Sequence, residues 1–236
     1  MIPWLTPDCS FPPIEEALDD PNGLLAAGAD LSPERLLNAY RRGIFPWFAD
    51  DEPILWWSPN PRCVMRPEAI HLSKSLRKRI RRGGFDVSFN NDFAAVINAC
   101  AQPRPGQPET WITEDIQQAY LNLHHLGHAH SVEVREDGQL IGGLYGIAIG
   151  KLFFGESMFS RRTDASKIAY VFFAKQLQKW GYALIDCQVY NDHLASLGAE
   201  VIPRTEFKHY LDRYLDIPCT HPWQFDLATD DIVSSQ

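Results

Sequence analysis

Several features that mark other protein classes are missing from this 236-residue chain. No stretch reaches the roughly 18 consecutive apolar residues of a membrane-spanning helix, and Met1–Ser10 has no basic region followed by an apolar run, so we expect neither a membrane span nor a secretory signal. The five cysteines are odd in number and scattered, and they include no CxxC pair. This argues against a disulfide framework and against a zinc site, and it favours the reducing cytoplasm.

Metal and thiol chemistry also find little support. His124 and His128 are four residues apart, but Gly127 is expected to end the helix between them, and no third ligand type lies nearby. Cys187 lies in an expected strand, where alternation would point it away from its polar neighbours, and no adjacent base is evident. We therefore expect no metal site and no cysteine nucleophile.

What is present is enough apolar material for a folded core, with a hydrophobic fraction of 45% and an aromatic fraction of 12%. The net charge of −8 is unevenly placed, because Arg62 to Arg82 contains eight basic residues and one acid, a local charge of +7 that leaves −15 elsewhere. Such a basic island on an acidic protein is typical of local contact with a polyanion.

The basic residues of the island are placed by an expected helix that Ser73 caps and Gly83-Gly84 end. Leu72, Leu76 and Ile80 form its apolar stripe, and the basic residues lie on the opposite face. Those predicted to contact the phosphate backbone of a nucleic acid are Lys74, Arg77, Lys78, Arg81 and Arg82.

Upstream of the island, Ser32-Pro33-Glu34 opens a helix that Gly43 closes. The Pro59-Asn60-Pro61 break predicts a domain boundary, with a small N-terminal domain at 1–61 and a larger domain at 62–236.

In the larger domain, a basic helix, a strand (85–89) and two helices (92–101 and 113–127) precede a strand meander at 131–135, 139–149 and 152–159. A helix at 165–180, a strand at 182–188, a short helix at 192–197, a strand at 201–202 and a helix at 206–214 follow. This is the order of the acetyltransferase-like (GNAT) fold, so we expect an α+β protein with a mixed sheet and flanking helices. The acidic tail after Cys219 is expected to pack loosely.

Several short motifs recur at characteristic spacing between about Pro21 and Tyr210. They are Pro21-Asn22-Gly23-Leu24-Leu25, Gly43-Ile44-Phe45-Pro46-Trp47-Phe48, Trp56-Trp57-Ser58-Pro59, Thr110-Trp111-Ile112-Thr113, His128-Ala129-His130-Ser131, Gly155-Glu156-Ser157-Met158-Phe159-Ser160, Leu184-Ile185-Asp186-Cys187-Gln188 and Asn191-Asp192-His193. Together they resemble the leucyl/phenylalanyl-tRNA–protein transferase family.

The resemblance implies a GNAT-like enzyme without coenzyme A. Such an enzyme moves leucine or phenylalanine, less readily methionine, from aminoacyl-tRNA to the N-terminal arginine or lysine of acceptor proteins, which marks them for degradation by the N-degron pathway. We expect a monomer that binds no membrane. The loop Arg161–Ser166 agrees with the absence of coenzyme A, because it contains none of the glycines that cradle pyrophosphate in acetyltransferases.

Asp186 and Gln188 are two residues apart in an expected strand, so alternation places them on one face as a polar site. We predict that they are catalytic and align the attacking amine of the acceptor. The alternative is that Asp186 only satisfies backbone donors at the strand end.

The resemblance assigns Trp47 and Trp111 to the 3′ adenosine of tRNA, and Glu156 to the basic residue of the acceptor. The expected pocket for the transferred side chain is formed by Leu144, Phe153, Met158, Phe173 and Ile185. Ordinary core packing remains the alternative for the tryptophans and for each pocket residue, and a hydrogen-bonded buried acid remains the alternative for Glu156.

Two other functions compete with this one. A coenzyme-A-dependent N-acetyltransferase would need a phosphate cradle that the 161–166 loop lacks. A non-catalytic tRNA-binding module would use the basic helix but would leave Asp186 and Gln188 without a purpose.

Overall fold

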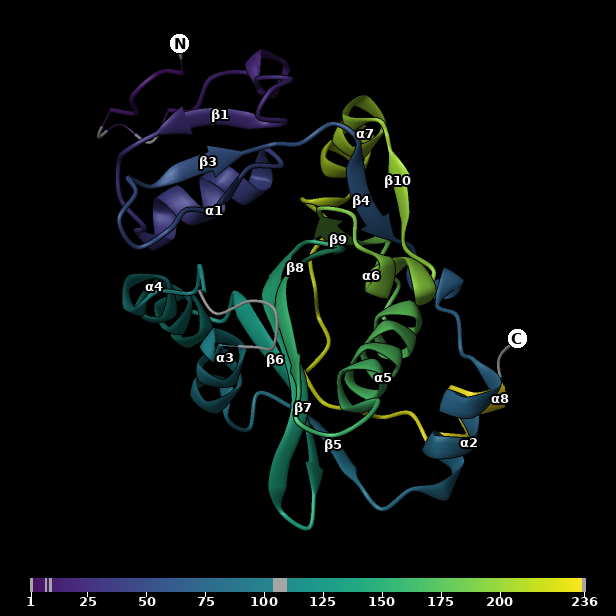
Figure 1. The fold of residues 1–236 in the computed structure, drawn as a ribbon. Coiled ribbons are helices and arrows are strands. Elements are labelled where there is room, and N and C mark those ends of the chain that lie inside the picture. The colour runs from purple at the N-terminus through teal and green to yellow at the C-terminus, as the bar shows by residue number, and fades with distance from the viewer. Residues whose placement is uncertain (1, 7, 9, 104–109, 235–236) are drawn as a thin grey trace.

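The computed structural model describes residues 2–6, 8, 10–103 and 110–234, without the side chain of Ser234. The segment from Pro103 to Pro108, whose prolines predict a loop, lies outside the described residues from position 104 onward. Figure 1 shows a small N-terminal sheet beside a larger sheet flanked by helices.

The small sheet has the strand order β1-β3-β2 and is antiparallel. Its strands are β1 (Leu24–Ala27), β2 (Phe45–Pro46) and β3 (Leu55–Trp57), and its helix is α1 (Pro33–Arg41). The Ser32 side chain accepts a hydrogen bond from the backbone N–H of Arg35 at 3.4 Å, so the predicted capped helix is confirmed.

The large sheet has the strand order β10-β4-β9-β8-β7-β6-β5. Its strands are β4 (Arg62–Met65), β5 (Asp86–Phe89), β6 (Ala129–Glu136), β7 (Gln139–Ile149), β8 (Leu152–Ser160), β9 (Leu184–Gln188) and β10 (Glu200–Ile202). β8 and β9 are parallel, whereas the other neighbouring strands are antiparallel. The sheet is therefore mixed, and the predicted α+β class is confirmed.

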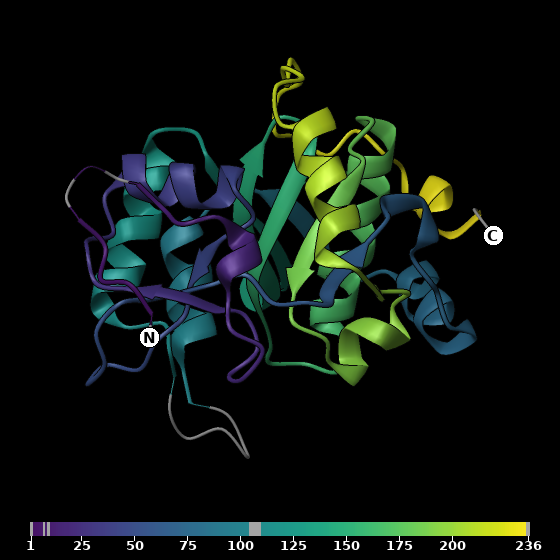
Figure 2. The same ribbon diagram turned by 90° about the horizontal axis from the view of Figure 1, so that it is seen from above.

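Helices cover both faces of this sheet, as Figure 2 shows from above. α3 and α4 pack on one face and α5 packs on the other. The helices are α2 (Lys74–Arg82), α3 (Phe93–Ala101), α4 (Glu114–His125), α5 (Ala165–Lys179), α6 (Asp192–Ser196), α7 (Arg204–Tyr214) and α8 (Thr229–Ser234), with 3₁₀ turns at Ile14–Glu16 and Pro67–Ala69. No helix in the described part of the chain is long and apolar enough to cross a membrane.

The predicted order of elements from the meander onward is confirmed, with ends that shift by one or two residues. The three strands of the small sheet and one strand of the large sheet were not predicted. Residues 62–65, which directly follow the proline break, form β4 and join the large sheet between β9 and β10. The break itself lies between the two sheets, and the proposed domain boundary there remains a prediction.

The expectation of a loosely packed tail is wrong. Ile232 and Val233 are buried in the core beside α2 and α5, and the ring of Phe225 stacks on that of Phe89 with 4.0 Å between centroids. The tail was misjudged because its charged residues are all acidic, whereas its packing depends on a few apolar side chains.

Candidate active site

A cavity opens where strands β8 and β9 part. Their parallel pairing ends at Phe154 and Asp186, but β8 continues to Ser160. The space between them is lined by Gly155–Ser160 on one side and by Cys187–Val189 on the other, and the cavity has a volume of about 880 Å³. That size suits a substrate with an apolar side chain and an attached polar group.

The apolar wall of the cavity comes from four different elements. All five residues predicted to form the side-chain pocket line it: Leu144, Phe153, Met158, Phe173 and Ile185. Leu144 lies opposite Met158 across β7 and β8, and Phe153 lies opposite Ile185 across β8 and β9. The structure therefore brings together residues that are up to 41 positions apart in sequence, as a hydrophobic pocket requires.

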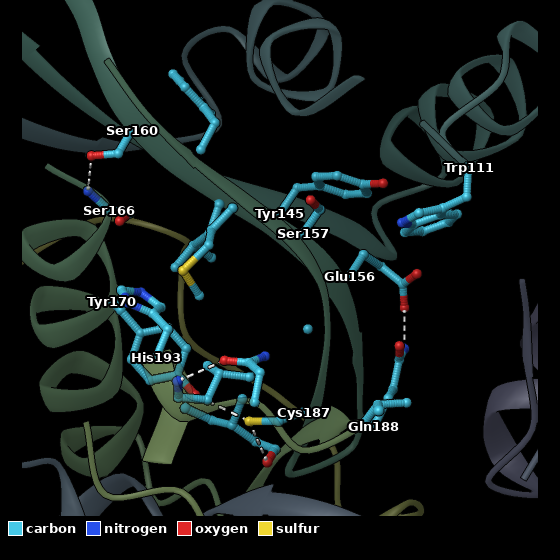
Figure 3. Close-up of a pocket in the computed structure, with 18 of the residues that line it drawn as sticks. Trp111, Tyr145, Glu156, Ser157, Ser160, Ser166, Tyr170, Cys187, Gln188 and His193 are labelled. Atoms are coloured by element: carbon cyan, nitrogen blue, oxygen red, sulfur yellow. Dashed lines mark hydrogen bonds between the residues drawn. The ribbon is translucent and has the colours of Figure 1, made fainter. Parts of the chain in front are cut away.

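The two tryptophans predicted to contact adenosine also line this cavity. Trp47 follows β2, and its side chain is 46% exposed, so burial does not account for it. Trp111 precedes α4, and in Figure 3 its ring lies on the same side of the cavity as Glu156. Large flat rings at the rim of a cavity are suited to stacking on a base.

Asp186 is placed differently from the prediction. Its carboxylate accepts two hydrogen bonds from the guanidinium of Arg62, at 2.8 and 2.7 Å, and the residue is only 1% exposed. Arg62 in turn donates to the carbonyl of Gly43 at 3.0 Å and lies over the rings of Phe45 and Phe207. Asp186 is not among the residues that line the cavity.

Gln188 does reach the cavity, and the reason is a change in the backbone. Its φ angle is +63°, which ends the regular alternation of β9. Its N–H donates to the Asp186 carboxylate at 3.0 Å, and its side-chain amide donates to Glu156 at 2.8 Å. The buried ion pair therefore fixes the backbone turn that presents Gln188.

Cys187 was expected to point away from both Asp186 and Gln188. This is wrong for Gln188, because Cys187 and Gln188 both line the cavity, whereas Asp186 does not. The hydroxyl of Tyr170 lies 3.3 Å from the Cys187 sulfur. The hydrogen bond that Cys187 shares with Cys63, together with burial, raises the pKa of the Cys187 thiol well above its usual value. Cys187 is therefore held as a neutral thiol, which is the unreactive form.

Glu156 is half-buried and stands among neutral hydrogen-bond donors. The hydroxyls of Tyr40 and Tyr120 donate to its two carboxylate oxygens at 2.7 and 2.9 Å, and Gln188 supplies a third hydrogen bond (Figure 3). Burial raises the pKa of Glu156 to about 7, although these three donors favour the charged form. Tyr40, Tyr120 and Arg62 were not predicted as site residues, since nothing in the sequence marks which buried tyrosines and arginines will converge.

The basic helix α2 exposes only part of its positive charge. Its predicted apolar stripe is buried, with Leu76 at 2% and Ile80 at 0% exposed. Lys74, Lys78, Arg81 and Arg82 are exposed, and in the described part of the chain none of them forms an ion pair.

Arg77 does not share this free face, since it is half-buried and its guanidinium donates to the carbonyl of Val233 in α8. Three further members of the basic island are engaged elsewhere. Arg62 is buried, Arg66 pairs with Glu200, and Arg79 pairs with Glu136. The surface available to a polyanion is therefore narrower than the sequence suggested.

The histidines considered as metal ligands include one that is engaged in packing. His124 stacks on Phe93 with 4.4 Å between ring centroids, and its Nδ1 lies 2.8 Å from the carbonyl of Ala129. Within residues 2–103 and 110–234, apart from positions 7 and 9, no three His, Cys, Asp or Glu side chains form a cluster that could hold a metal ion.

Comparisons with known proteins agree with the motifs. Leucyl/phenylalanyl-tRNA–protein transferase from Pseudomonas putida (strain W619) is 58% identical over 95% of this chain and 100% of its own length. The enzyme from Stutzerimonas stutzeri (strain A1501) is 56% identical over the same shares. Among solved structures, a GCN5-related N-acetyltransferase from Kribbella flavida is similar with a TM-score of 0.35 and 13% identity, covering 73% of this chain and 61% of that chain.

Two family models match as well. The leucyl/phenylalanyl-tRNA protein transferase model matches residues 64–212, and the model of its N-terminal domain matches residues 29–60. The chain therefore belongs to the leucyl/phenylalanyl-tRNA–protein transferase family and is an aminoacyltransferase.

Proposed function

We propose that this enzyme transfers leucine or phenylalanine, and less readily methionine, from aminoacyl-tRNA to the N-terminal arginine or lysine of acceptor proteins. The product carries a new peptide bond and enters the N-degron pathway in the cytoplasm. The observation that carries the proposal is one cavity that combines an apolar pocket, two rim tryptophans and the Glu156–Gln188 pair.

The donor end of the reaction uses the apolar wall and the rim. The leucyl or phenylalanyl side chain enters the pocket lined by Leu144, Phe153 and Phe173, and the terminal adenosine stacks between Trp47 and Trp111. The free basic residues of α2 hold the tRNA backbone through phosphate contacts, which supply affinity without reading bases. Binding of this kind needs no coenzyme A, and the glycine-free 161–166 loop supports that.

The acceptor end uses the polar side of the cavity. Gln188 contacts and orients the attacking amine, and the negative charge of Glu156 attracts the cationic N-terminal residue of the acceptor. Asp186 acts one step further away as a positioning residue, since its pairing with Arg62 holds the N–H of Gln188 in place.

The test is to incubate the enzyme with radiolabelled leucyl-tRNA and a protein that begins with arginine. We expect label to enter the protein. The same protein beginning with an uncharged residue is the control and should take up little label. If label enters neither protein, the proposal is wrong.

A parallel arm addresses the competing acetyltransferase. Acetyl-coenzyme A should leave the melting temperature of the enzyme unchanged, whereas a coenzyme-A-dependent enzyme would gain stability from ligand binding. A raised melting temperature with acetyl-coenzyme A and no transfer from leucyl-tRNA would favour the acetyltransferase.

A further inference from the structure

The oxygens of Tyr40, Tyr120 and Glu156 form a closed triangle beside the cavity. The two tyrosine hydroxyls contact each other, and each also contacts one carboxylate oxygen, at 2.7 Å for Tyr40 and 2.9 Å for Tyr120. The tyrosines come from separate elements, α1 and α4, and both are completely buried. Two helices therefore converge on a single carboxylate on β8.

The proton count of this triangle is informative. Three oxygen–oxygen contacts are present, but two hydroxyls supply only two protons, so one contact has no hydrogen bond while Glu156 is ionised. A third proton on the carboxyl lets it donate to one tyrosine and completes the ring of hydrogen bonds. The triangle is thus built to take up one proton.

Glu156 forms no ion pair with a positively charged side chain among the described residues. The nearby Arg62 is fully engaged with Asp186 and Gly43. The other titratable groups that line the cavity are Tyr145 on β7, Arg161 directly after β8, Tyr170 on α5, Cys187 on β9 and His193 on α6. The negative charge of the buried Asp186 on β9 also acts on Glu156 and raises its pKa. Glu156 is therefore a carboxylate held by neutral donors and open to the substrate space.

We propose, on the basis of the function proposed above, that Glu156 is the catalytic proton acceptor of the transfer reaction and that Tyr40 and Tyr120 are positioning residues that hold it. The acceptor arrives as an ammonium and gives one proton to the Glu156 carboxylate. Its nitrogen then attacks the ester carbonyl carbon of aminoacyl-tRNA. The new C–N bond forms, the C–O bond to the terminal ribose breaks, and the second amine proton goes to the ribose oxygen that leaves.

The proton balance closes when Glu156, half-buried at the cavity wall, releases its proton to water. The pKa of the proton acceptor is close to that of the proton donor. Burial raises the pKa of Glu156 to about 7, and an N-terminal amine has a pKa of about 8. A carboxylate with an ordinary pKa would be a much weaker base. The rate should rise as pH rises through the pKa of Glu156, because only the carboxylate can accept the proton.

Removing one tyrosine hydroxyl should move this pH dependence. When Glu156 is ionised, the loss of one tyrosine donor destabilises the carboxylate by about 1.5–3 kcal/mol. When Glu156 is protonated, the loss of one neutral hydrogen bond costs only about 0.5–1.5 kcal/mol. The first effect is larger. The midpoint of the acid limb of the pH–rate profile in Tyr40→Phe and in Tyr120→Phe should therefore shift upward by about one pH unit.

The experiment measures transfer from leucyl-tRNA to one peptide beginning with arginine, between about pH 5.5 and 9, for each variant. Because every enzyme meets the same amine, the contribution of the amine to the profile is common to all of them. A folded fraction that is constant across this pH range does not change the midpoint, and circular dichroism of each variant at each pH checks that it is constant. Tyr182→Phe is the matched control, since its buried hydroxyl bonds to Cys219 and not to Glu156, and its midpoint should not move.

Glu156→Gln should lower transfer by about 10²-fold at about pH 8, the scale of a missing general base. Wild-type rates in that variant, or an unmoved or lowered midpoint in both tyrosine variants, would overturn the inference while leaving the transferase function intact. Absence of transfer by the wild-type enzyme would overturn the proposed function and this inference together.

Discussion

Two carboxylates lie on neighbouring strands of the same sheet, and their surroundings are opposite. Asp186 on β9 is buried against a guanidinium that binds both of its oxygens, and the cavity does not reach it. Glu156 on β8 lines the cavity and has only hydroxyl and amide donors as partners among the described residues. A fully paired carboxylate fixes structure, whereas one without a cation retains its capacity for protons and for cationic substrates.

The largest expected effect comes from removing the buried ion pair between Asp186 and Arg62. Asp186→Asn leaves the Arg62 charge buried without its partner, so the free energy of unfolding should fall by about 3–5 kcal/mol. Urea denaturation measures this decrease. Asp192→Asn is the control. Asp192 is exposed at the start of α6, so this change should alter the free energy of unfolding by less than about 0.5 kcal/mol.

A double variant sharpens this test. If Asp186 serves mainly to pair with Arg62, the combination Arg62→Met with Asp186→Leu should recover most of the stability that Asp186→Asn removes, because buried pairs can often be replaced by apolar residues. Wild-type stability in Asp186→Asn, together with a transfer rate lowered by about 10²-fold, would instead make Asp186 a direct catalytic group.

The apolar wall should discriminate among donors next most strongly. Leucine and phenylalanine should be accepted over isoleucine and valine, whose Cβ branches meet the rigid Phe153 and Phe173 walls, both 1% exposed. The preference should be about 10–200-fold in kcat/KM, since an apolar pocket separates such side chains by about 1–3 kcal/mol. Competition between leucyl- and isoleucyl-tRNA measures it, and equal values would remove these residues from the pocket.

A comparable or smaller effect is expected at the rim. Trp111→Ala should raise KM for leucyl-tRNA by an amount that corresponds to about 1–3 kcal/mol of missing stacking energy, with kcat little changed. Trp111→Phe keeps a flat ring and should retain most of the affinity. An unchanged KM in the alanine variant would show that Trp111 only packs beside α4.

The smallest effect is expected on α2, outside the cavity. Lys78→Glu with Arg81→Glu should weaken tRNA binding and flatten its dependence on salt, by about one unit of slope for each phosphate that is no longer neutralised. Arg77→Gln is the informative comparison, because this side chain donates to the Val233 carbonyl and should affect stability more than the salt slope. A salt titration identical to wild type in the double variant would exclude α2 from the tRNA site.

Local sequence patterns predicted most of the elements. Caps and terminal glycines located α1 and α2, and strand alternation with turn signals located the meander of β6, β7 and β8. The apolar stripe of α2 was predicted correctly for the same reason, because the period of a helix is a local property. The pocket residues and the rim tryptophans were named from the family resemblance, and the fold places all of them around one cavity.

What local patterns could not decide is which side chains meet across the fold. Alternation predicted that Asp186 and Gln188 share a face. The positive φ of Gln188 instead turns its side chain to the cavity, and Arg62 on the neighbouring strand β4 binds Asp186 away from it. Local patterns also did not indicate that Tyr40 and Tyr120 are neighbours. They are 80 residues apart and meet only because α1 and α4 pack together.

The sequence by itself determined the elements, the family and the chemical groups available, because these depend on residue types and short spacings. Only the tertiary structure decided that Arg62 neutralises Asp186 and leaves Glu156 to two tyrosines. The reason is physical: the charge state and availability of a carboxylate depend on burial and on partners within a few ångströms, and long-range packing sets both.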